Sequence, residues 1–351
     1  MNSKYQSFLF NFSASYGGGG LKRLLEYSSW FNENGGGIFI VNFRLDGIDK
    51  QFPMNKYFFL QQSKFSRAFN YSSQLDKIIA NTKKIDLYYS YGIPIPRKIG
   101  QVNWFHLSNV LPLTKISVFI PLKRRIEMRF LGFLINHCLK NANVISAESD
   151  TSMGLFNKHL SQKLVVSVNG SDDEINACKN NDNISDNREI EDIAVTVGTY
   201  YYKCIDDVYK IYTHLLKSHP SLRLVIIGER EHIPQFVLKD NRVNAKGVLS
   251  QAAVCDLLRR SKYYITSTVI ENSYNAASEG AFLSNESFIS DIGPHRELLK
   301  GAIFEKIDNL GTRVASLHLK RTDLNSRNLK SWDQVVTEMI DLTKNIKSEG
   351  C

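Results

Sequence analysis

Two kinds of apolar pattern alternate along this chain of 351 residues. Short continuous apolar runs have the character of β-strands, and longer runs with apolar residues every three or four positions have the character of helices. The strand-like runs are residues 7–12, 37–43, 85–89, 102–107, 143–146, 163–169, 193–198, 222–228, 243–248 and 263–267. The helical runs include residues 21–31, 125–140, 206–217 and 252–260. Helices between strands are typical of parallel sheets covered on both faces, so the sequence predicts an α/β protein.

A polar stretch rich in Asn and Asp divides these runs into two groups. It occupies about residues 171–190 and is the best linker in the chain. We therefore expect two Rossmann-like doubly wound domains, residues 1–170 and 191–330, that face a central cleft. A last helix over residues 331–348 is expected to join the first domain. Ligands of such sheets bind at the carboxyl ends of the strands, so the cleft is the expected site.

The charge of the chain is unevenly distributed. Residues 1–163 contain 21 Lys and Arg against 9 Asp and Glu, a formal charge of +12, and residues 164–351 contain 23 against 26, a charge of −3. The basic half is suited to nucleic acid, anionic lipid head groups or a phosphorylated substrate, or it is a solvated surface with no such role. No nucleic-acid-binding motif accompanies the charge.

Cysteine usage and hydropathy indicate a reducing compartment and no membrane span. The five cysteines are scattered and form no CxxC pair, which is typical of free thiols. No apolar stretch approaches about 20 residues, the length that a transmembrane helix needs. The apolar run after residue 7 is too short for a signal peptide. We expect a cytoplasmic protein.

Four glycines at residues 17–20 lie between a strand-like run and a helical run that begins with Lys22 and Arg23. Glycines let backbone approach a ligand closely, and a helix N-terminus favours anions. No Lys-Ser or Lys-Thr follows, so this is not a Walker loop. A flexible turn explains the glycines equally well.

The segment TSTVIENSYNAASEGAFL, residues 266–283, is the most informative stretch. The strand over residues 263–267 ends at the beginning of this segment, just before a short loop, and a helix is expected to start near Ser273. Glu271 and Glu279 can then face one side, where each carboxylate can accept hydroxyl hydrogens of a sugar. The amides of Ser273, Tyr274 and Asn275 would be the unpaired donors of the helix start and suit a diphosphate. Two glutamates at this spacing also occur by chance in ordinary capped helices.

Three further features are candidates for function. Lys203 follows the strand over residues 193–198 and can neutralise a leaving phosphate, although surface lysines are common. His106 follows a strand of the first domain and can bind a substrate hydroxyl, or it is a satisfied half-buried histidine. A run of basic and apolar residues after Pro121 fits an interfacial helix on an anionic membrane, or an ordinary surface helix. Its basic members are Lys123, Arg124, Arg125 and Arg129.

Several chemistries lack their usual residues. The chain contains no Asp-x-Asp, HExxH or GxSxG sequence and no Cys/His cluster with metal-ligand spacing. We expect neither a bound metal nor another cofactor.

Taken in order, these motifs resemble the retaining glycosyltransferases of family 4, which have the GT-B fold. The matching pieces are the glycines at 17–20, His106, Asn169-Gly170, Gly198 with Lys203, LRLVIIGE at 222–229, AKGVLS at 245–250 and the pair Glu271 and Glu279. The sequence IENSYNAASEG resembles that of bacterial enzymes that build O-antigen and other surface polysaccharides. The resemblance covers nearly the whole chain.

The resemblance implies a site for a nucleotide-activated hexose. Glu279 would bind the ribose, Glu271 the sugar hydroxyls, and His106 would reach the sugar from the first domain. Glu271, Lys203 and His106 are thus the catalytic candidates. The remaining donor-binding candidates are Gly247 and Val248 at the base, Asn272, and, around the diphosphate with Lys203, Gly18, Gly19, Ser273, Tyr274 and Asn275. Retention in this family is usually explained by front-face attack, in which the leaving phosphate helps to deprotonate the acceptor and no protein nucleophile is required.

Two positions depart from the family pattern. Thr199 stands where the family usually has Arg, and Asn272 where many relatives have Gly. Lys22, Arg23 or Arg230 are the candidates to replace the missing cation. The identity of the donor sugar stays open because of Asn272.

The resemblance also implies an acceptor on a lipid diphosphate at the inner face of the cytoplasmic membrane. The basic first domain, with Lys123, Arg124, Arg125 and Arg129, would be attracted to that surface. Three other functions remain open: a nucleotide-sugar epimerase of the same fold, a non-catalytic nucleotide-sugar-binding subunit of an assembly complex, and a nucleic-acid-binding protein supported by charge alone.

Overall fold

The computed structural model describes residues 5, 7–61, 73–82, 84–115, 120–156, 161–171, 189–323 and 329–349. They belong to two compact units. The first comprises Met1–Lys115, Pro121–Gly170 and Lys330–Cys351, and the second comprises Ile116–Ile120 and Ser171–Leu329. Most of the expected linker, residues 172–188, lies outside the described residues.

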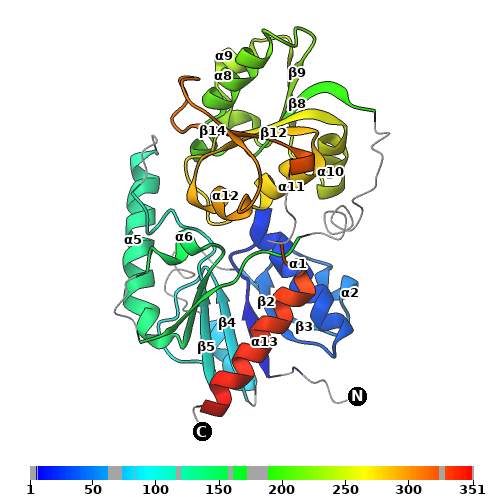
Figure 1. The fold of residues 1–351 in the computed structure, drawn as a ribbon. Coiled ribbons are helices and arrows are strands. Elements are labelled where there is room, and N and C mark those ends of the chain that lie inside the picture. The colour runs from blue at the N-terminus through cyan, green and yellow to red at the C-terminus, as the bar shows by residue number, and fades with distance from the viewer. Residues whose placement is uncertain are drawn as a thin grey trace. The chain divides into compact units, whose positions relative to one another are not determined.

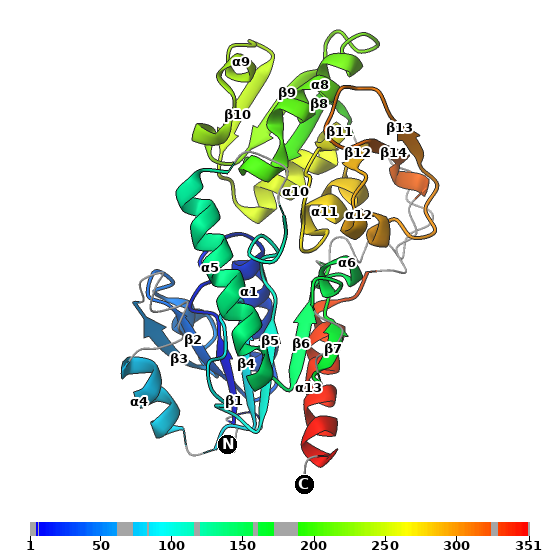
Figure 2. The ribbon, with the colours of Figure 1, turned by 90° about the vertical axis from the view of Figure 1, so that its left-hand side faces the viewer.

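The first unit is built on a parallel sheet of seven strands in the order β3-β2-β1-β4-β5-β6-β7 (Figure 1). The strands are β1 Phe8–Asn11, β2 Ile38–Asn42, β3 Lys56–Leu60, β4 Leu87–Tyr91, β5 Val102–His106, β6 Val144–Ala147 and β7 Lys163–Val166. The helices are α1 Gly18–Glu33, α2 Ile48–Gln51, α4 Ser73–Asn81, α5 Leu122–Cys138, α6 Asp150–Met153 and α13 Trp332–Glu349, with a 3₁₀ turn at Leu139–Asn141. Figure 2 shows α5 in front of this sheet.

Aromatic side chains fill the core of the first unit. Phe10 of β1 stacks on Phe39 of β2 with ring centroids 5.0 Å apart, and it meets Phe31 of α1 at 4.8 Å. Residues of β1 are buried on both faces of the sheet, which explains its continuous apolar sequence. Trp104 of β5 is also buried in this core. Burial of each large aromatic side chain contributes about 2–3 kcal/mol.

The last helix, α13, packs against α1 in the first unit (Figure 1). Its apolar side chains, spaced every three or four residues, enter the aromatic core. At its start, Trp332 lies against Gly170, where a Cβ atom would come within 2.5 Å of the indole. Trp30 of α1 donates a hydrogen bond of 2.7 Å to Asp333. The C-terminal segment is therefore an integral part of the first unit.

The second unit contains a sheet in the order β10-β9-β8-β11-β12-β14-β13. Five neighbouring strands pair in parallel, and at one edge β14 pairs antiparallel with both β12 and β13. The strands are β8 Glu191–Val197, β9 Arg223–Ile227, β10 Val243–Gly247, β11 Ser261–Thr266, β12 Glu286–Ser290, β13 Glu305–Ile307 and β14 Ser316–Lys320. The helices are α8 Ile205–Leu215, α9 Gln235–Leu238, α10 Gln251–Arg260, α11 Asn275–Leu283 and α12 Gly293–Leu298, with 3₁₀ turns at Tyr201–Lys203, Arg230–His232 and Arg321–Asp323.

The structure differs from the sequence expectations in three places. Residues 163–169 were expected to form a buried strand, but β7 ends at Val166 and is partly exposed because it is the edge strand of its sheet. Three of the four glycines at residues 17–20 form the first turn of α1 rather than a loop before it. The strands β3, β12, β13 and β14 were not predicted from the sequence. Among the described helices, none is both long and apolar enough to cross a membrane.

Candidate active site

An ion pair lies where two neighbouring strands of the second unit end. Lys203 follows β8 at the end of a 3₁₀ turn, and Glu271 lies in the loop after β11. Lys203 Nζ donates a hydrogen bond to Glu271 Oε1 at 2.5 Å. The two side chains are 13% and 19% exposed, so the pair is sheltered but open to a ligand. Two of the three catalytic candidates thus meet at the edge where parallel sheets bind ligands.

The backbone after β8 is shaped for this lysine. Gly198 has a φ of +88°, a conformation that favours glycine, and an added Cβ atom would lie 3.1 Å from Lys203 Cε. The next residue, Thr199, is buried, and its hydroxyl donates a 2.9 Å hydrogen bond to the carbonyl oxygen of Glu229. Thr199 therefore ties the loop after β8 to the loop after β9, at the position where the resemblance leads one to expect an arginine.

Helix α11 begins at Asn275, two residues later than the sequence predicted. Ser273 and Tyr274 precede the helix, and the carbonyl of Tyr274 accepts a 2.7 Å hydrogen bond from the amide of Ser278. Asn275 therefore opens the first helical turn, whereas the amide of Ser273 belongs to the preceding loop. Asn272 and Tyr274 are buried beside this loop.

Glu279 lies on the second turn of α11 and is buried. The following residue, Gly280, packs flat on the ring of Tyr264 in β11, where a Cβ atom would come within 2.1 Å of the ring. This close packing fixes α11 against β11. It also fixes the position of Glu279 relative to the strand that precedes Glu271.

Sequence reasoning missed His295, which lies in α12 after β12. Its Nδ1 donates a 2.8 Å hydrogen bond to the carbonyl oxygen of Ser290. Burial lowers the pKa of His295 to about 4, with the Lys203 cation acting in the same direction and the Glu271 carboxylate against it. The imidazole is therefore neutral at pH 7. The signal was the sequence GPHRE, which gained meaning only once β12 was known.

Gly247 and Val248 lie at the carboxyl end of β10. Gly247 has a φ of +74° with open space around it, and Val248 is 76% exposed. The nearby loop after β9 contains one group of side chains that could converge on a metal ion among the described residues: Glu229, Glu231 and His232. The two glutamates are exposed, and the group is separate from the Lys203–Glu271 pair in sequence and strand.

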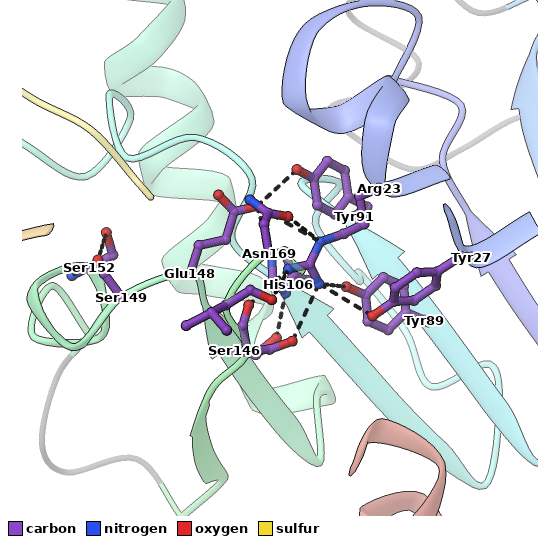
Figure 3. A network of polar contacts seen from close by, with 12 residues as sticks. Arg23, Tyr27, Tyr89, Tyr91, His106, Ser146, Glu148, Ser149, Ser152 and Asn169 are labelled. Carbon is purple, nitrogen blue, oxygen red and sulfur yellow. Dashed lines mark hydrogen bonds and ion pairs between the residues drawn. The ribbon is translucent and has the colours of Figure 1, made fainter. Parts of the chain in front are cut away.

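A buried polar network occupies the carboxyl ends of β4, β5 and β6 in the first unit (Figure 3). Its centre is Arg23 of α1, which is fully buried. The guanidinium donates to Asn169 at 3.0 Å, to the carbonyls of Ser167 and Val168 at 2.9 Å each, and to the hydroxyls of Tyr27 and Tyr89. The guanidinium of Arg23 thus binds groups inside this unit. It is not placed to replace the arginine that the family has at the position of Thr199.

Glu148 is the acidic member of the network and was not predicted from the sequence. It is 4.0 Å from Arg23 Nε and accepts a 3.1 Å hydrogen bond from the Tyr91 hydroxyl. Burial alone would raise the pKa of Glu148, but the hydrogen bond from His106 and the Arg23 charge lower it below its usual value. The opposite charges of the buried Arg23 and the buried Glu148 thus compensate each other.

His106, the third catalytic candidate, is enclosed by the same network. Its Nδ1 accepts from the Ser146 hydroxyl at 2.8 Å, and its Nε2 lies 3.4 Å from Glu148 Oε1. The ring stacks on Tyr91 at 5.1 Å, and the side chain is fully buried. Burial, together with the Arg23 charge, lowers the pKa of His106 to about 4. Both ring nitrogens are occupied by the first unit's own side chains, so this arrangement gives no support to a contact between His106 and a sugar.

The glycine-rich turn of α1 lies next to this network in the sequence. Gly17, Gly18 and Gly19 are exposed, and Gly18 has a φ of +60° with no atom within 4 Å of an added Cβ. Gly20 packs more closely, since a Cβ atom there would lie 3.0 Å from Ser15 Oγ and from the Tyr91 ring. Gly17 and Gly18 thus leave open space, as the resemblance implies for a ligand at Gly18.

Helix α5 presents an exposed apolar stripe. Leu122, Ile126, Phe130 and Phe133 are spaced four, four and three residues apart and are 69%, 59%, 41% and 64% exposed. The basic side chains that were predicted from the sequence, Lys123, Arg124, Arg125 and Arg129, are exposed on the same helix. Exposed apolar side chains flanked by cations are typical of interfacial helices.

Comparison with protein families finds no match, and comparison with curated proteins finds none either. Solved structures do match. HepE from Anabaena in complex with UDP is 14% identical, with 97% of this chain and 93% of that chain covered and a TM-score of 0.58. The UDP-forming trehalose-phosphate synthase from Burkholderia vietnamiensis is 10% identical, with 98% and 100% covered and a TM-score of 0.62. The sucrose-phosphate synthase from Thermosynechococcus elongatus is 11% identical, with the same coverage and a TM-score of 0.68.

The chain has the GT-B fold. The predicted α/β class is confirmed by the two parallel-dominated sheets and by these structures. The similar proteins are GT-B glycosyltransferases, and HepE is also solved with UDP-glucose. At 10–15% identity the likeness shows the fold of this chain and leaves its reaction to be tested.

Proposed function

We propose that this protein is a retaining, metal-independent glycosyltransferase of the family 4 type. It transfers a hexose from a nucleotide-sugar to an oligosaccharide on a polyprenyl diphosphate during synthesis of bacterial O-antigen or a related surface polysaccharide. The observation that carries the proposal is the Lys203–Glu271 pair at the carboxyl edge of a GT-B sheet. The UDP and UDP-glucose complexes of HepE support a nucleotide-sugar as the ligand class.

The second unit supplies the donor site in this proposal. Glu279 binds the ribose, and the backbone at Gly247 and Val248 contacts the base. Lys203 and the first turn of α11 bind the diphosphate, with the helix dipole favouring its negative charge. Glu271 is then positioned between Lys203 and the hydroxyls of the sugar. The contribution of Gly18 and Gly19 stays a prediction from the family resemblance.

The proposed reaction requires no covalent enzyme intermediate. The bond between the anomeric carbon and the diphosphate oxygen breaks, and the acceptor hydroxyl oxygen forms the new bond on the same face. The acceptor proton passes to the departing phosphate oxygen. Lys203 stabilises the charge that develops on this phosphate, an interaction that is stronger in the transition state than in the ground state.

The exposed face of α5 supports an acceptor in a membrane. Its four basic side chains are attracted to an anionic leaflet by about 1 kcal/mol each, and the apolar stripe of Leu122, Ile126, Phe130 and Phe133 can enter the interface. We therefore place the protein at the cytoplasmic face of the membrane, bound peripherally through α5.

The test is the melting temperature of the protein with the UDP, GDP, ADP and dTDP series, each with and without EDTA. A ligand that binds the folded state raises the melting temperature by mass action. We expect a rise with one series that EDTA leaves unchanged, and release of the nucleotide when a lipid-linked acceptor is added. Binding without turnover would favour the non-catalytic subunit, for which Thr199 is the supporting feature. No rise with any series would contradict the proposal.

A further inference from the structure

His295 is a buried acceptor that the proposed donor site does not yet use. Its Nδ1 is held by the Ser290 carbonyl at 2.8 Å, and the side chain is 2% exposed. Since Nδ1 bears the hydrogen, Nε2 has a lone pair and can only accept a hydrogen bond. Within the residues that the structure describes, Nε2 has no hydrogen-bond partner. An acceptor of a largely buried side chain that has no partner in a candidate site is available to a ligand.

The topology places His295 beside the ion pair. Lys203 follows β8, Glu271 follows β11 and His295 follows β12, and these three parallel strands are neighbours in the order β8-β11-β12. Thr266 at the end of β11 pairs with Ile289 near the end of β12. The carboxyl ends of all three strands therefore lie at one edge of the sheet. The charges of Lys203 and Glu271 both influence the pKa of His295, as expected for groups at the same edge of the sheet.

We infer that His295 Nε2 accepts a hydrogen bond from a hydroxyl of the donor sugar. This inference rests on the proposed function. It makes His295 a specificity-determining residue, because Nε2 and the Glu271 carboxylate would both accept hydrogen bonds from hydroxyls of the sugar. Such a site selects sugars with hydroxyls in reach of both acceptors. A sugar that lacks the matching hydroxyl leaves a buried acceptor unpaired and binds less well.

Two amide substitutions of His295 test the roles of its two ring nitrogens separately. His295→Asn keeps a donor at the place of Nδ1 for the Ser290 carbonyl and removes the acceptor at Nε2. His295→Gln places an amide oxygen at the position of Nε2. His214, which is exposed on α8 of the same unit, provides the matched control His214→Asn.

The experiment measures dissociation constants by calorimetry for four probe pairs: UDP and UDP-glucose, GDP and GDP-mannose, ADP and ADP-glucose, dTDP and dTDP-glucose. For the pair that binds, we expect His295→Asn to weaken the sugar nucleotide about tenfold and the free nucleotide less than twofold. His295→Gln should restore the sugar nucleotide to within about threefold of the unmodified protein, and His214→Asn should change neither.

Equal weakening of both probes by His295→Asn, no weakening, or a failure of His295→Gln to restore binding overturns the inference. Each of these leaves nucleotide binding by the unmodified protein, and so the proposed function, intact. A lack of binding of all four pairs to the unmodified protein contradicts the proposed function itself. Melting temperatures of the variants verify that each is folded.

Discussion

Lys203 Nζ lies 2.5 Å from Glu271 Oε1, although 68 residues separate them in the sequence. The pair joins two loops that follow adjacent strands, and it is sheltered from water. A sheltered cation at the carboxyl edge of a sheet interacts more strongly with an added negative charge than a cation on an open surface does. Lys203 therefore interacts strongly with the negative charge that develops on a phosphate at this site.

Lys203→Ala should lower turnover much more than donor binding. We expect kcat to fall about 100-fold and the donor dissociation constant to rise less than about fivefold, since the ammonium acts mainly on charge that develops during the reaction. Steady-state kinetics and calorimetry measure the two effects. Lys217→Ala, which removes an exposed lysine of the same unit, is the control. Unchanged turnover in Lys203→Ala would exclude the residue from the mechanism.

Glu279→Gln should weaken binding of the free nucleotide. The substitution retains the shape of a buried side chain on α11 and removes the charge that is proposed to accept the ribose hydroxyls. A hydrogen bond to a charged group contributes about 1.5–3 kcal/mol, which corresponds to roughly a 10- to 150-fold rise in the dissociation constant. Glu305→Gln on the exposed edge strand β13 is the control. Equal affinity in both variants would place the ribose elsewhere.

Arg23→Met should destabilise the first unit strongly. The substitution leaves the Glu148 carboxylate buried without its compensating cation and leaves the carbonyls of Ser167 and Val168 without their donor. Loss of one partner of a buried ion pair costs about 3–5 kcal/mol. Urea unfolding followed by circular dichroism measures the change, with the exposed Arg44→Met as the control. A loss below about 1 kcal/mol would show that the network does not hold the unit together.

Stability should fall as the pH is lowered through the range in which the unfolded histidine titrates. The pKa of His106 is lowered to about 4 in the folded protein, against 6.5 in an unfolded chain. The unfolded state therefore binds the proton first, and the stabilisation is complete above pH 6.5 and is lost as the pH falls towards 4. Between pH 7 and pH 5 we expect a loss of about 2 kcal/mol from this residue. Urea unfolding of His106→Gln should show a shallower dependence on pH, and an identical slope would be inconsistent with a neutral buried imidazole.

Removal of charge from α5 should weaken binding to anionic membranes. Lys123→Ala combined with Arg125→Ala should lower partitioning onto phosphatidylserine-containing liposomes by about 30-fold at low salt, at about 1 kcal/mol for each cation. Sedimentation with liposomes measures the effect at 20 mM and 300 mM salt, where the Debye length is about 22 Å and about 6 Å. The pair Lys217→Ala and Lys239→Ala removes equal charge from exposed sites of the second unit and should bind normally. Equal loss in both pairs would remove α5 from the proposed surface.

The sequence predicted the fold class because parallel strands buried on both faces are continuous apolar runs, as in β1 and β9. The strands without such runs were missed. Strand β3 lies at a sheet edge and is mostly exposed or half-buried, and β13 and β14 lie at the antiparallel edge of the second sheet. The propensity of residues for strands depends strongly on whether a strand is central or at an edge, so short edge strands are hard to predict.

The site was predictable where a residue directly follows a recognisable strand. Lys203 and Glu271 each lie in a loop after such a strand, and the structure brings them into contact. His295 follows a strand with the sequence ESFIS, which has no distinctive pattern. The role of Arg23 was invisible because a cation near a glycine-rich turn suggests a ligand, whereas its partners are the distant Asn169, Tyr89 and Glu148. Long-range polar contacts of this kind leave no spacing rule in the sequence.

The aromatic core of the first unit has one practical consequence. All three tryptophans of the chain, Trp30, Trp104 and Trp332, belong to that unit. Indole emission therefore reports on the first unit alone, while the peptide backbone signal reports on both. If the two units unfold independently, the tryptophan fluorescence and the ellipticity will change at different denaturant concentrations. The protein thus contains a natural optical label for one half of itself, with the other half spectroscopically silent above 295 nm excitation.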